Sequence, residues 1–149
     1  MIEMFDCVDE NDCVLGQESR EEVHRKGIYH RAVHIFARSD SGKWILQRRS
    51  AEKDTEPLLW TTTCSGHVDA GESYEDAAIR EFQEEVGVEV NHLELLELLR
   101  LSPCLETGNE FVRVYVNKNI VSPVPNLAEI LELEDFSLSL IHISEPTRP

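Results

Sequence analysis

The stretch "GHVDAGESYEDAAIREFQEEVGV", from Gly66 to Val88, decides the fold of this chain. Glu84 and Glu85 stand three and four positions after Glu81, a spacing that places all three carboxylates on one face of an α-helix. Like charges at this spacing repel, so such a face is either simply solvated or neutralised by a bound cation. The rest of the sequence helps to decide between these two interpretations.

Helix boundaries stand on both sides of the three glutamates. Ser73 is a residue type that caps helix N-termini and Gly87 a type that ends helices, so we predict a helix over 74–86. At about 100° per residue, its apolar side chains fall within a sector of about 60°. These side chains are Ile79, Phe82 and Val86. One face of the helix is therefore expected to pack on a core, while another carries carboxylates.

Length and charge limit the possible functions. A chain of 149 residues with 41% hydrophobic residues predicts one domain with a real core. Asp and Glu number 29 against 14 Lys and Arg, which gives a formal net charge of −15. Such a charge argues against nucleic acid or an anionic membrane as a partner. If the substrate is nevertheless an anion, a divalent cation is the expected mediator.

The four cysteines form no CxxC pair and no zinc-like cluster. A reduced, cytoplasmic protein is therefore expected rather than a disulfide framework. Residues 1–12 are acidic and lack the apolar segment of a signal peptide, and no stretch approaches the roughly 20 apolar residues of a membrane span.

Alternating apolar residues and turn signals predict a fold that is otherwise rich in strands. Residues 92–102 fit either a strand or a short helix, and a strand is favoured. The expected elements, in chain order, are a hairpin around the turn 9–12, a helix ending at Gly27, and strands over 30–38, 43–49, 60–66, 92–102, 109–119 and 130–138.

The opening stretch resembles a complete Nudix box, G-x5-E-x7-R-E-U-x-E-E-x-G-U, in which U is an aliphatic or bulky apolar residue. Every fixed position and both apolar positions match, from Gly66 through Glu72 and Arg80 to Val88. The resemblance implies an α/β fold, the Nudix α/β/α sandwich with a mixed central sheet. It also implies hydrolysis of a small-molecule diphosphate, nucleoside-linked or otherwise organic, with Mg²⁺ or Mn²⁺ as cofactor.

The chemistry explains why this motif needs carboxylates at this spacing. Attack of water on a diphosphate requires neutralised phosphoryl oxygens and a deprotonated nucleophile, and hard divalent cations with oxygen ligands supply both. The resemblance implies an ion pair between Arg80 and Glu72 that braces the loop on the helix. It assigns catalysis to Glu81, Glu84, Glu85, Arg80 and Glu72, and metal binding to the Gly66 carbonyl, Glu81, Glu84, Glu85 and Glu110.

A wider similarity covers roughly residues 4–137 and resembles the Nudix branch close to isopentenyl-diphosphate isomerases. His30, His67 and Glu110 match cage or catalytic positions of those enzymes, although Glu110 on an alternating strand is also compatible with a solvated edge. This similarity makes an isomerase the main alternative to a hydrolase. A catalytically silent Nudix binding module is the other alternative.

Four residues are candidates for contact with the substrate. By the same resemblance, Arg49 and Lys53 match contacts to the diphosphate. His67 either contacts the substrate or only packs in its loop. Trp60 either joins the core or stacks on a ring of the substrate.

Three departures favour the hydrolase over the isomerase. Ser65 stands where the isomerase has its catalytic cysteine, and Cys64 is one position away, so on a strand it faces the opposite side. Glu81 replaces a basic residue that binds diphosphate. Gly108 stands where a glutamate that binds metal is expected.

The C-terminal residues differ in composition from the rest. We interpret residues 1–138 as one Nudix domain and residues 139–149, "SLIHISEPTRP", as a non-native tail. Family members continue into a C-terminal helix at this point, so the helix is expected to be truncated here, leaving apolar surface exposed. A homodimer is a possible assembly.

Overall fold

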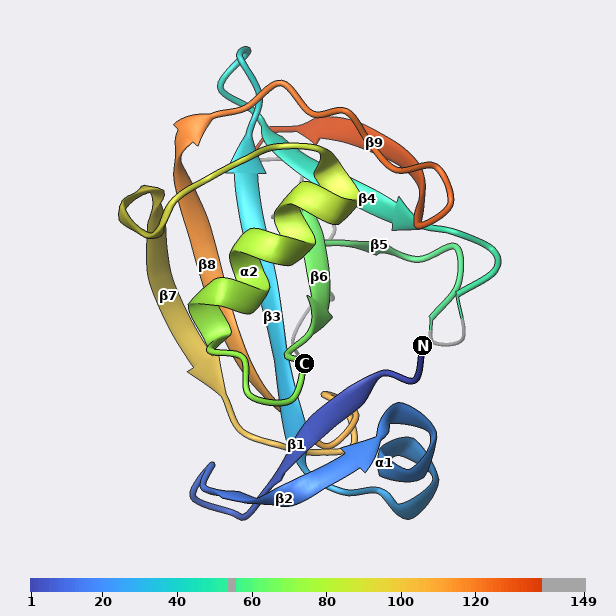
Figure 1. The fold of residues 1–149 in the computed structure, drawn as a ribbon. Helices are drawn as coiled ribbons and strands as arrows, with labels where there is room; N and C mark the ends of the chain where they lie inside the picture. Colours follow the sequence, from blue (N-terminus) through green and yellow to red (C-terminus); the bar gives the residue numbers. More distant parts are fainter. Residues whose placement is uncertain (54–55, 138–149) are drawn as a thin grey trace, which may run out of the picture.

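A seven-stranded mixed sheet forms the centre of the computed structural model, which describes residues 1–53 and 56–137. The strand order is β5-β4-β3-β8-β7, with β6 also paired to β3 and β9 to β4 (Figure 1). β3 and β8 run parallel, and the other pairs in this sheet are antiparallel. The strands are β3 (His30–Arg38), β4 (Trp44–Arg49), β5 (Trp60–Thr61), β6 (Cys64–His67), β7 (Leu95–Leu101), β8 (Glu110–Ile120) and β9 (Ile130–Phe136).

The strands expected from alternation are present, with two differences in detail. The segment 92–102 is a strand, as favoured, but it begins with a 3₁₀ turn at His92–Glu94. The segment 60–66 is divided into β5 and β6 because Thr63 lies between β3 and β4. Its hydroxyl accepts from Ala37 N at 2.8 Å and donates to Ile45 O at 2.5 Å, so a side chain replaces strand pairing there.

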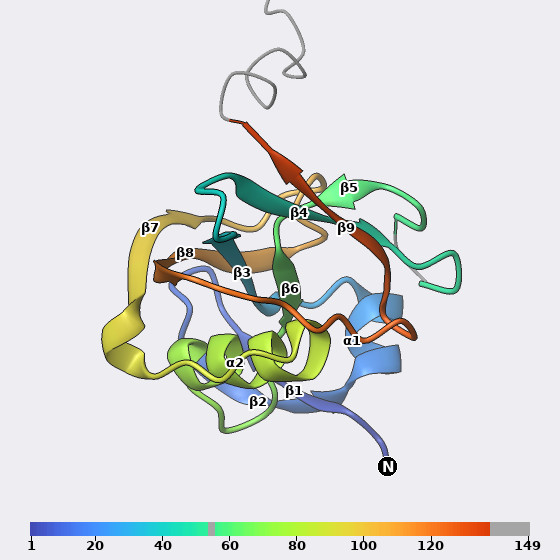
Figure 2. The same cartoon turned by 90° about the horizontal axis from the view of Figure 1, so that it is seen from above.

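The expected helix crosses one face of the central sheet (Figures 1 and 2). It begins as α2 (Tyr74–Glu81), where Ser73 Oγ accepts from Asp76 N at 3.1 Å, and ends at Gly87 with φ of +73°. The expectation of a continuous α-helix is wrong in the last part, because residues Phe82–Val86 form a π-helical turn. Such turns are frequent at functional sites.

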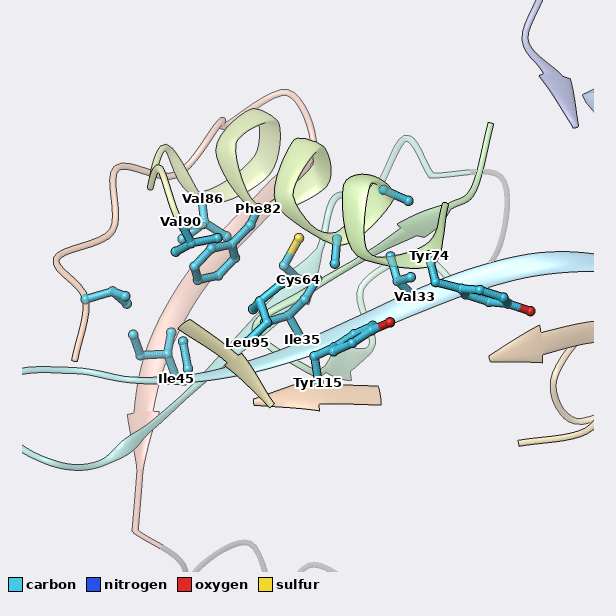
Figure 3. Packing of buried hydrophobic residues seen from close by; sticks show 14 of the residues in the cluster. Val33, Ile35, Ile45, Cys64, Tyr74, Phe82, Val86, Val90, Leu95 and Tyr115 are labelled. Carbon is cyan, nitrogen blue, oxygen red and sulfur yellow. The ribbon is translucent and has the colours of Figure 1, made fainter. Parts of the chain in front are cut away.

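The apolar stripe of this helix packs on the sheet, as expected. Phe82 and Val86 point toward the sheet, where the buried cluster includes Val33 and Ile35 of β3 and Tyr115 of β8 (Figure 3). Phe82, Val86, Val33 and Ile35 are all 0% exposed. Each such side chain contributes about 1.5–3 kcal/mol on burial, so this layer fixes the helix, and with it the glutamates, over β6.

The expected N-terminal hairpin is also present and lies at one end of the central sheet (Figure 1). β1 (Met4–Val8) and β2 (Val14–Ser19) pair antiparallel and lead into helix α1 (Arg20–Lys26). Ser19 Oγ caps α1 by accepting from Glu22 N at 3.3 Å, and Gly27 ends it with φ of +66°. The hairpin and α1 therefore lie at the end of the sheet where β3 and β8 begin.

The face of the sheet opposite α2 carries a band of apolar side chains. In register across the sheet, Ala32 of β3 pairs with Val112 of β8, which pairs with Leu101 of β7. Val114, the next β8 position on this face, is buried, whereas Leu101 at the sheet edge is 44% exposed. The face of the sheet opposite α2 therefore has an apolar surface formed by side chains of β3, β8 and β7.

The truncated C-terminal helix falls on residues 138–149, outside the described residues. Among the residues that are described, no helix is long and apolar enough to cross a membrane. All four cysteines lie in the described part of the chain and are free thiols there.

Candidate active site

Gly66 and Glu81 approach each other so closely that a side chain at position 66 would displace the Glu81 carboxylate. A Cβ placed on Gly66 would lie 2.2 Å from Glu81 Cδ and 2.4 Å from Glu81 Oε1. The glycine at the end of β6 therefore allows the backbone and this carboxylate to share one small space. Burial raises the pKa of Glu81 to about 7; Arg80 opposes this shift, and the neighbouring Glu85 adds to it.

Glu85 is the most deeply buried of the three box glutamates, with its side chain 4% exposed. Its Oε1 accepts from Ser65 N at 3.2 Å and from Gln47 Nε2 at 3.3 Å. Lys53 Nζ lies 3.9 Å from Oε2 and also contacts Glu129. Burial raises the pKa of Glu85, while these donors and Lys53 oppose the shift.

Glu84 differs from the other two box glutamates. Its side chain is 59% exposed, and Oε2 accepts from Arg80 Nη1 at 3.3 Å. All three carboxylates line the same cavity, but only Glu81 and Glu85 are turned inward, so the expectation of one common face is only partly right.

Arg80 joins the loop to the helix, as the motif implies. Its guanidinium donates to both oxygens of Glu72 at 2.9 Å each, a bidentate pair. Nη2 also donates to the carbonyl of His67 at 3.0 Å, and Nη1 to Glu81 Oε1 at 2.8 Å. One partly buried cation therefore fixes the loop after β6 and orients a box carboxylate.

These groups open into a cavity of about 940 Å³. Of the four candidate substrate contacts, Arg49, Lys53 and His67 line it. Trp60 is not part of its described lining; its ring instead packs edge-on against Phe136, with centroids 5.4 Å apart. The cavity thus combines cations and carboxylates with the apolar band of the open sheet face.

A second group of possible metal ligands lies where the hairpin meets β3 and β8. One ligand atom each from His24, His30, His67 and Glu110 lies within 4.8 Å of the others. Glu110 Oε1 is 2.9 Å from His67 Nε2 and 3.4 Å from His30 Nε2. Burial alone would raise the pKa of Glu110, but the two histidines outweigh it and lower the pKa to about 2.

His30 is oriented toward this group by the backbone. Its Nδ1 lies 2.8 Å from the carbonyl of Ile28, which can only accept, so Nδ1 carries the proton. The buried Nε2 faces the group and lies 3.4 Å from Glu110 Oε1. Phe5 of β1 stacks on the rings of His30 and His67 at 5.6 and 4.7 Å.

His24 is the member of this group that the sequence gives little reason to select. It lies on α1, and its ring is 5.2 Å from that of His30 and 5.3 Å from that of His67. In the sequence, His24 is only a histidine six positions before His30. Its approach to the other ligands depends on how α1 packs against β3, which the spacing does not predict.

Comparison with known proteins assigns the chain to a family. A family model described as the NUDIX domain matches residues 28–147. The chain belongs to the Nudix hydrolase family. An uncharacterized Nudix hydrolase of Nostoc sp. is 36% identical over 132 residues, covering 88% of this chain and 78% of that protein. Isopentenyl-diphosphate Delta-isomerase 2 of Photorhabdus laumondii is 32% identical over 132 residues, covering 87% of this chain and 75% of that protein.

Solved structures show the same fold. The crystal structure of DR0079 from Deinococcus radiodurans matches with a TM-score of 0.79 at 29% identity, covering 99% of this chain and 93% of that one. The MutT protein of Methanosarcina mazei matches with a TM-score of 0.65 at 22% identity, covering 78% and 83%. The predicted fold class, a Nudix domain with a mixed central sheet, is confirmed.

The positions that separate Nudix hydrolases from isomerases are clear in the structure. Cys64 is buried in the core with 0% exposure, and Ser65 lines the cavity, so the two side chains lie on opposite sides of β6. Burial raises the pKa of the Cys64 thiol. Gly108 also lines the cavity and offers no ligand atom from a side chain.

We expect Gly66→Ala in the Nudix box to lower hydrolysis at least tenfold. The added methyl group occupies the space of the Glu81 carboxylate, which must then rotate away. The side chain can move, so the free energy of unfolding should change by only about 1 kcal/mol. Steady-state rates and thermal melts measure both quantities. Gly16→Ala, where nothing lies within 4 Å of the added Cβ, is the control, and equal rates for the two variants would contradict the prediction.

The metal-free protein should lose stability as the pH rises from about 4.5 to about 7. Glu81 has a folded-state pKa of about 7 against an ordinary value of 4.5, so the folded state binds a proton more tightly than the unfolded state. The protonated Glu81 stabilises the fold fully at pH values below the unfolded-state pKa. This stabilisation is lost as the pH rises through the folded-state pKa, which lowers the free energy of unfolding by roughly 3 kcal/mol. Urea unfolding at pH 5 and 7.5 measures it. A Glu81→Gln variant with an equally large difference would show that another group is responsible.

Proposed function

We propose that the chain hydrolyses the diphosphate bond of a small organic or nucleoside-linked diphosphate in a reaction that requires Mg²⁺ or Mn²⁺. The observation that carries the proposal is the approach of two inward-turned carboxylates to adjacent residues of β6, Glu81 to Gly66 and Glu85 to the backbone N–H of Ser65. Arg49 and Lys53 line the same cavity, so cationic groups that suit a diphosphate stand beside carboxylates that suit a divalent metal.

The donor set of the box fits a hard cation. Carboxylates and a backbone carbonyl are oxygen ligands, and the raised pKa values of Glu81 and Glu85 indicate that burial leaves their negative charge under-compensated. We propose that Glu81, Glu85 and the Gly66 carbonyl hold the metal, with Glu84 at the rim. Glu110 belongs with the imidazoles of the second group, a mixed nitrogen and oxygen donor set that suits Mn²⁺ better than Mg²⁺.

The chemical step is a displacement at phosphorus. The oxygen of a water molecule bonds to phosphorus, the bond to the bridging oxygen breaks, and the bridging oxygen leaves with the other phosphate. We assign Glu81 or a neighbouring carboxylate as the base that accepts the proton of the water. Arg49 and Lys53 bind the phosphate oxygens. A bound divalent cation would supply charge neutralisation and a more acidic water.

Arg80 and Glu72 act on this step only through position. The bidentate pair and the bond to the His67 carbonyl hold the loop that carries Gly66 against the helix that carries Glu81. Release of cleavage products (phosphate, pyrophosphate or phosphomonoesters) from a panel of nucleoside triphosphates, ADP-ribose, dinucleotide cofactors and isoprenyl diphosphates, with and without each metal, tests the proposal. Absence of metal-stimulated release across the panel would favour a silent binding module.

The isomerase alternative is favoured by one observation, the group of three histidines and Glu110, together with the similarity to isomerases. We expect the purified protein not to interconvert isopentenyl and dimethylallyl diphosphates, because Ser65 lacks a thiol to transfer the proton. Ser65→Cys alone should not create the activity, since Glu81 and Gly108 also differ from the isomerase pattern. Isotope exchange or product chromatography measures it, and isomerisation by the unmodified protein would overturn the choice of a hydrolase.

We propose further that the Nudix domain spans residues 1–138, that the protein works in the cytoplasm and that it can form a homodimer. The free cysteines support a reducing compartment. The exposed leucines on β7, among them Leu96 and Leu99, support self-association.

A further inference from the structure

His34 occupies a central place in the cavity that the proposed chemistry does not use. It lies on β3 facing away from α2, in register with Ser65 of β6 on one side and Val114 of β8 on the other. All three residues line the cavity. The cavity floor is therefore polar near the box carboxylates and apolar over β8 and β7, and His34 lies between these two parts.

A chain of two hydrogen bonds determines which nitrogen of His34 carries a proton. Thr62 Oγ1 lies 3.0 Å from the carbonyl of Cys64, which can only accept, so the hydroxyl proton is donated there. Thr62 Oγ1 is also 2.9 Å from His34 Nδ1. The assignment that satisfies both contacts has Nδ1–H donating to Thr62. Nε2 of the neutral ring is then an acceptor.

Nothing in the described protein pairs with this acceptor. The side-chain hydrogen bond of His34 is made through Nδ1, and Nε2 has no partner among the described residues. Burial lowers the pKa of His34; Glu110 opposes this shift, and Arg49 and His67 add to it. The ring is therefore neutral at pH 7, and a neutral acceptor stands in the middle of the cavity floor.

We propose that His34 is a specificity-determining residue whose Nε2 accepts a hydrogen bond from an N–H or O–H group on the organic part of the substrate. Val112 and Val114 contact the apolar surface of the same organic group. The inference rests on the proposed hydrolase function and narrows its substrate class. A hydrocarbon chain in this position would cover the acceptor without pairing it, and an unpaired buried polar group is costly.

The experiment compares one substrate that carries donors with one that does not. The probes are CDP, with N–H and O–H donors, and dimethylallyl diphosphate, which has none in its organic group. We expect His34→Phe to lower kcat/KM for CDP by roughly ten- to hundredfold while leaving that for dimethylallyl diphosphate unchanged or higher. His34→Gln, which restores an acceptor at similar reach, should recover part of the loss. An equal effect on both probes, or none on CDP, would overturn the proposal.

Thr62→Val tests the assignment of the proton without altering the imidazole. It removes the oxygen that accepts from Nδ1, so the other tautomer becomes populated and the preference for CDP should fall by a smaller factor. An unchanged preference would overturn the tautomer argument.

If the unmodified protein cleaves no diphosphate with either metal, the proposed function fails separately. The role of His34 is then tested by the rise in melting temperature on adding CMP or dimethylallyl monophosphate. A larger rise with CMP that disappears in His34→Phe supports the role, and a preference for CMP that is unchanged in His34→Phe overturns it.

Discussion

Replacement of Glu85 by glutamine is expected to reduce diphosphate hydrolysis by about a thousandfold or more while leaving the metal-free protein at least as stable as before. The carboxylate is buried between Gln47 and the Ser65 amide, and both donors can still bond to the amide oxygen of a glutamine. Only the negative charge is removed. The loss of rate therefore reports the charge and not the packing.

The stability argument follows from the direction of the pKa. Burial raises the pKa of Glu85, so its ionised form at pH 7 costs free energy in the metal-free fold. Glutamine removes that cost, although it weakens the interactions of Glu85 with Cys64 and Lys53. Added Mg²⁺ or Mn²⁺ should raise the melting temperature of the unmodified protein by preferential binding to the folded state. The rise should be much smaller in the variant.

A matched control separates the box charge from helix charge in general. Glu75→Gln makes the same chemical change on the same helix, at a side chain that is 52% exposed and bonded to His92. It should leave both the rate and the metal-induced shift unchanged. If Glu85→Gln keeps full activity and the full shift, the carboxylate patch is only a solvated face and the proposed mechanism fails.

The features that could be predicted from the sequence are those that the resemblance to the Nudix box implies or that the periodicity of a strand or helix determines. Glu72 and Arg80 are eight positions apart, across a loop and two turns of helix, and their bidentate pair follows the motif. The burial of Cys64 and the cavity position of Ser65 follow from the alternation of a strand. The apolar stripe through Phe82 and Val86 follows from helical periodicity in the same way.

What could not be predicted depends on contacts between distant segments. Phe82–Val86 adopt a π-helical turn that periodicity cannot distinguish from an α-helix, and Glu84 accordingly lies at the rim. His24 joins the imidazole group only because the hairpin packs against β3. Trp60 turns toward Phe136 because β5 and β9 both flank β4, a pairing set by residues about seventy positions apart.

Removal of Arg80 should act on the fold itself, in contrast to Glu85→Gln. Arg80→Ala is expected to lower the free energy of unfolding by roughly 2–4 kcal/mol, because Glu72 keeps a largely buried charge without its bidentate partner. The melting temperature should fall by roughly 5–15 °C. The loss should persist with metal bound, because a metal at the box carboxylates does not replace the donors to Glu72 and to the His67 carbonyl.

The pair can be isolated by a double-mutant cycle measured with and without Mg²⁺. Adding Glu72→Gln to Arg80→Ala removes the unpaired charge, so the double variant should be more stable than Arg80→Ala alone. Arg80→Lys should recover only part of the loss, because an ammonium group cannot donate in parallel to both oxygens of Glu72. A melting temperature of Arg80→Ala within about 1 °C of the unmodified protein would show that the ion pair does not brace the loop. Glu81 would then owe its position to the close approach of Gly66 and to the packing of Phe82 beside it.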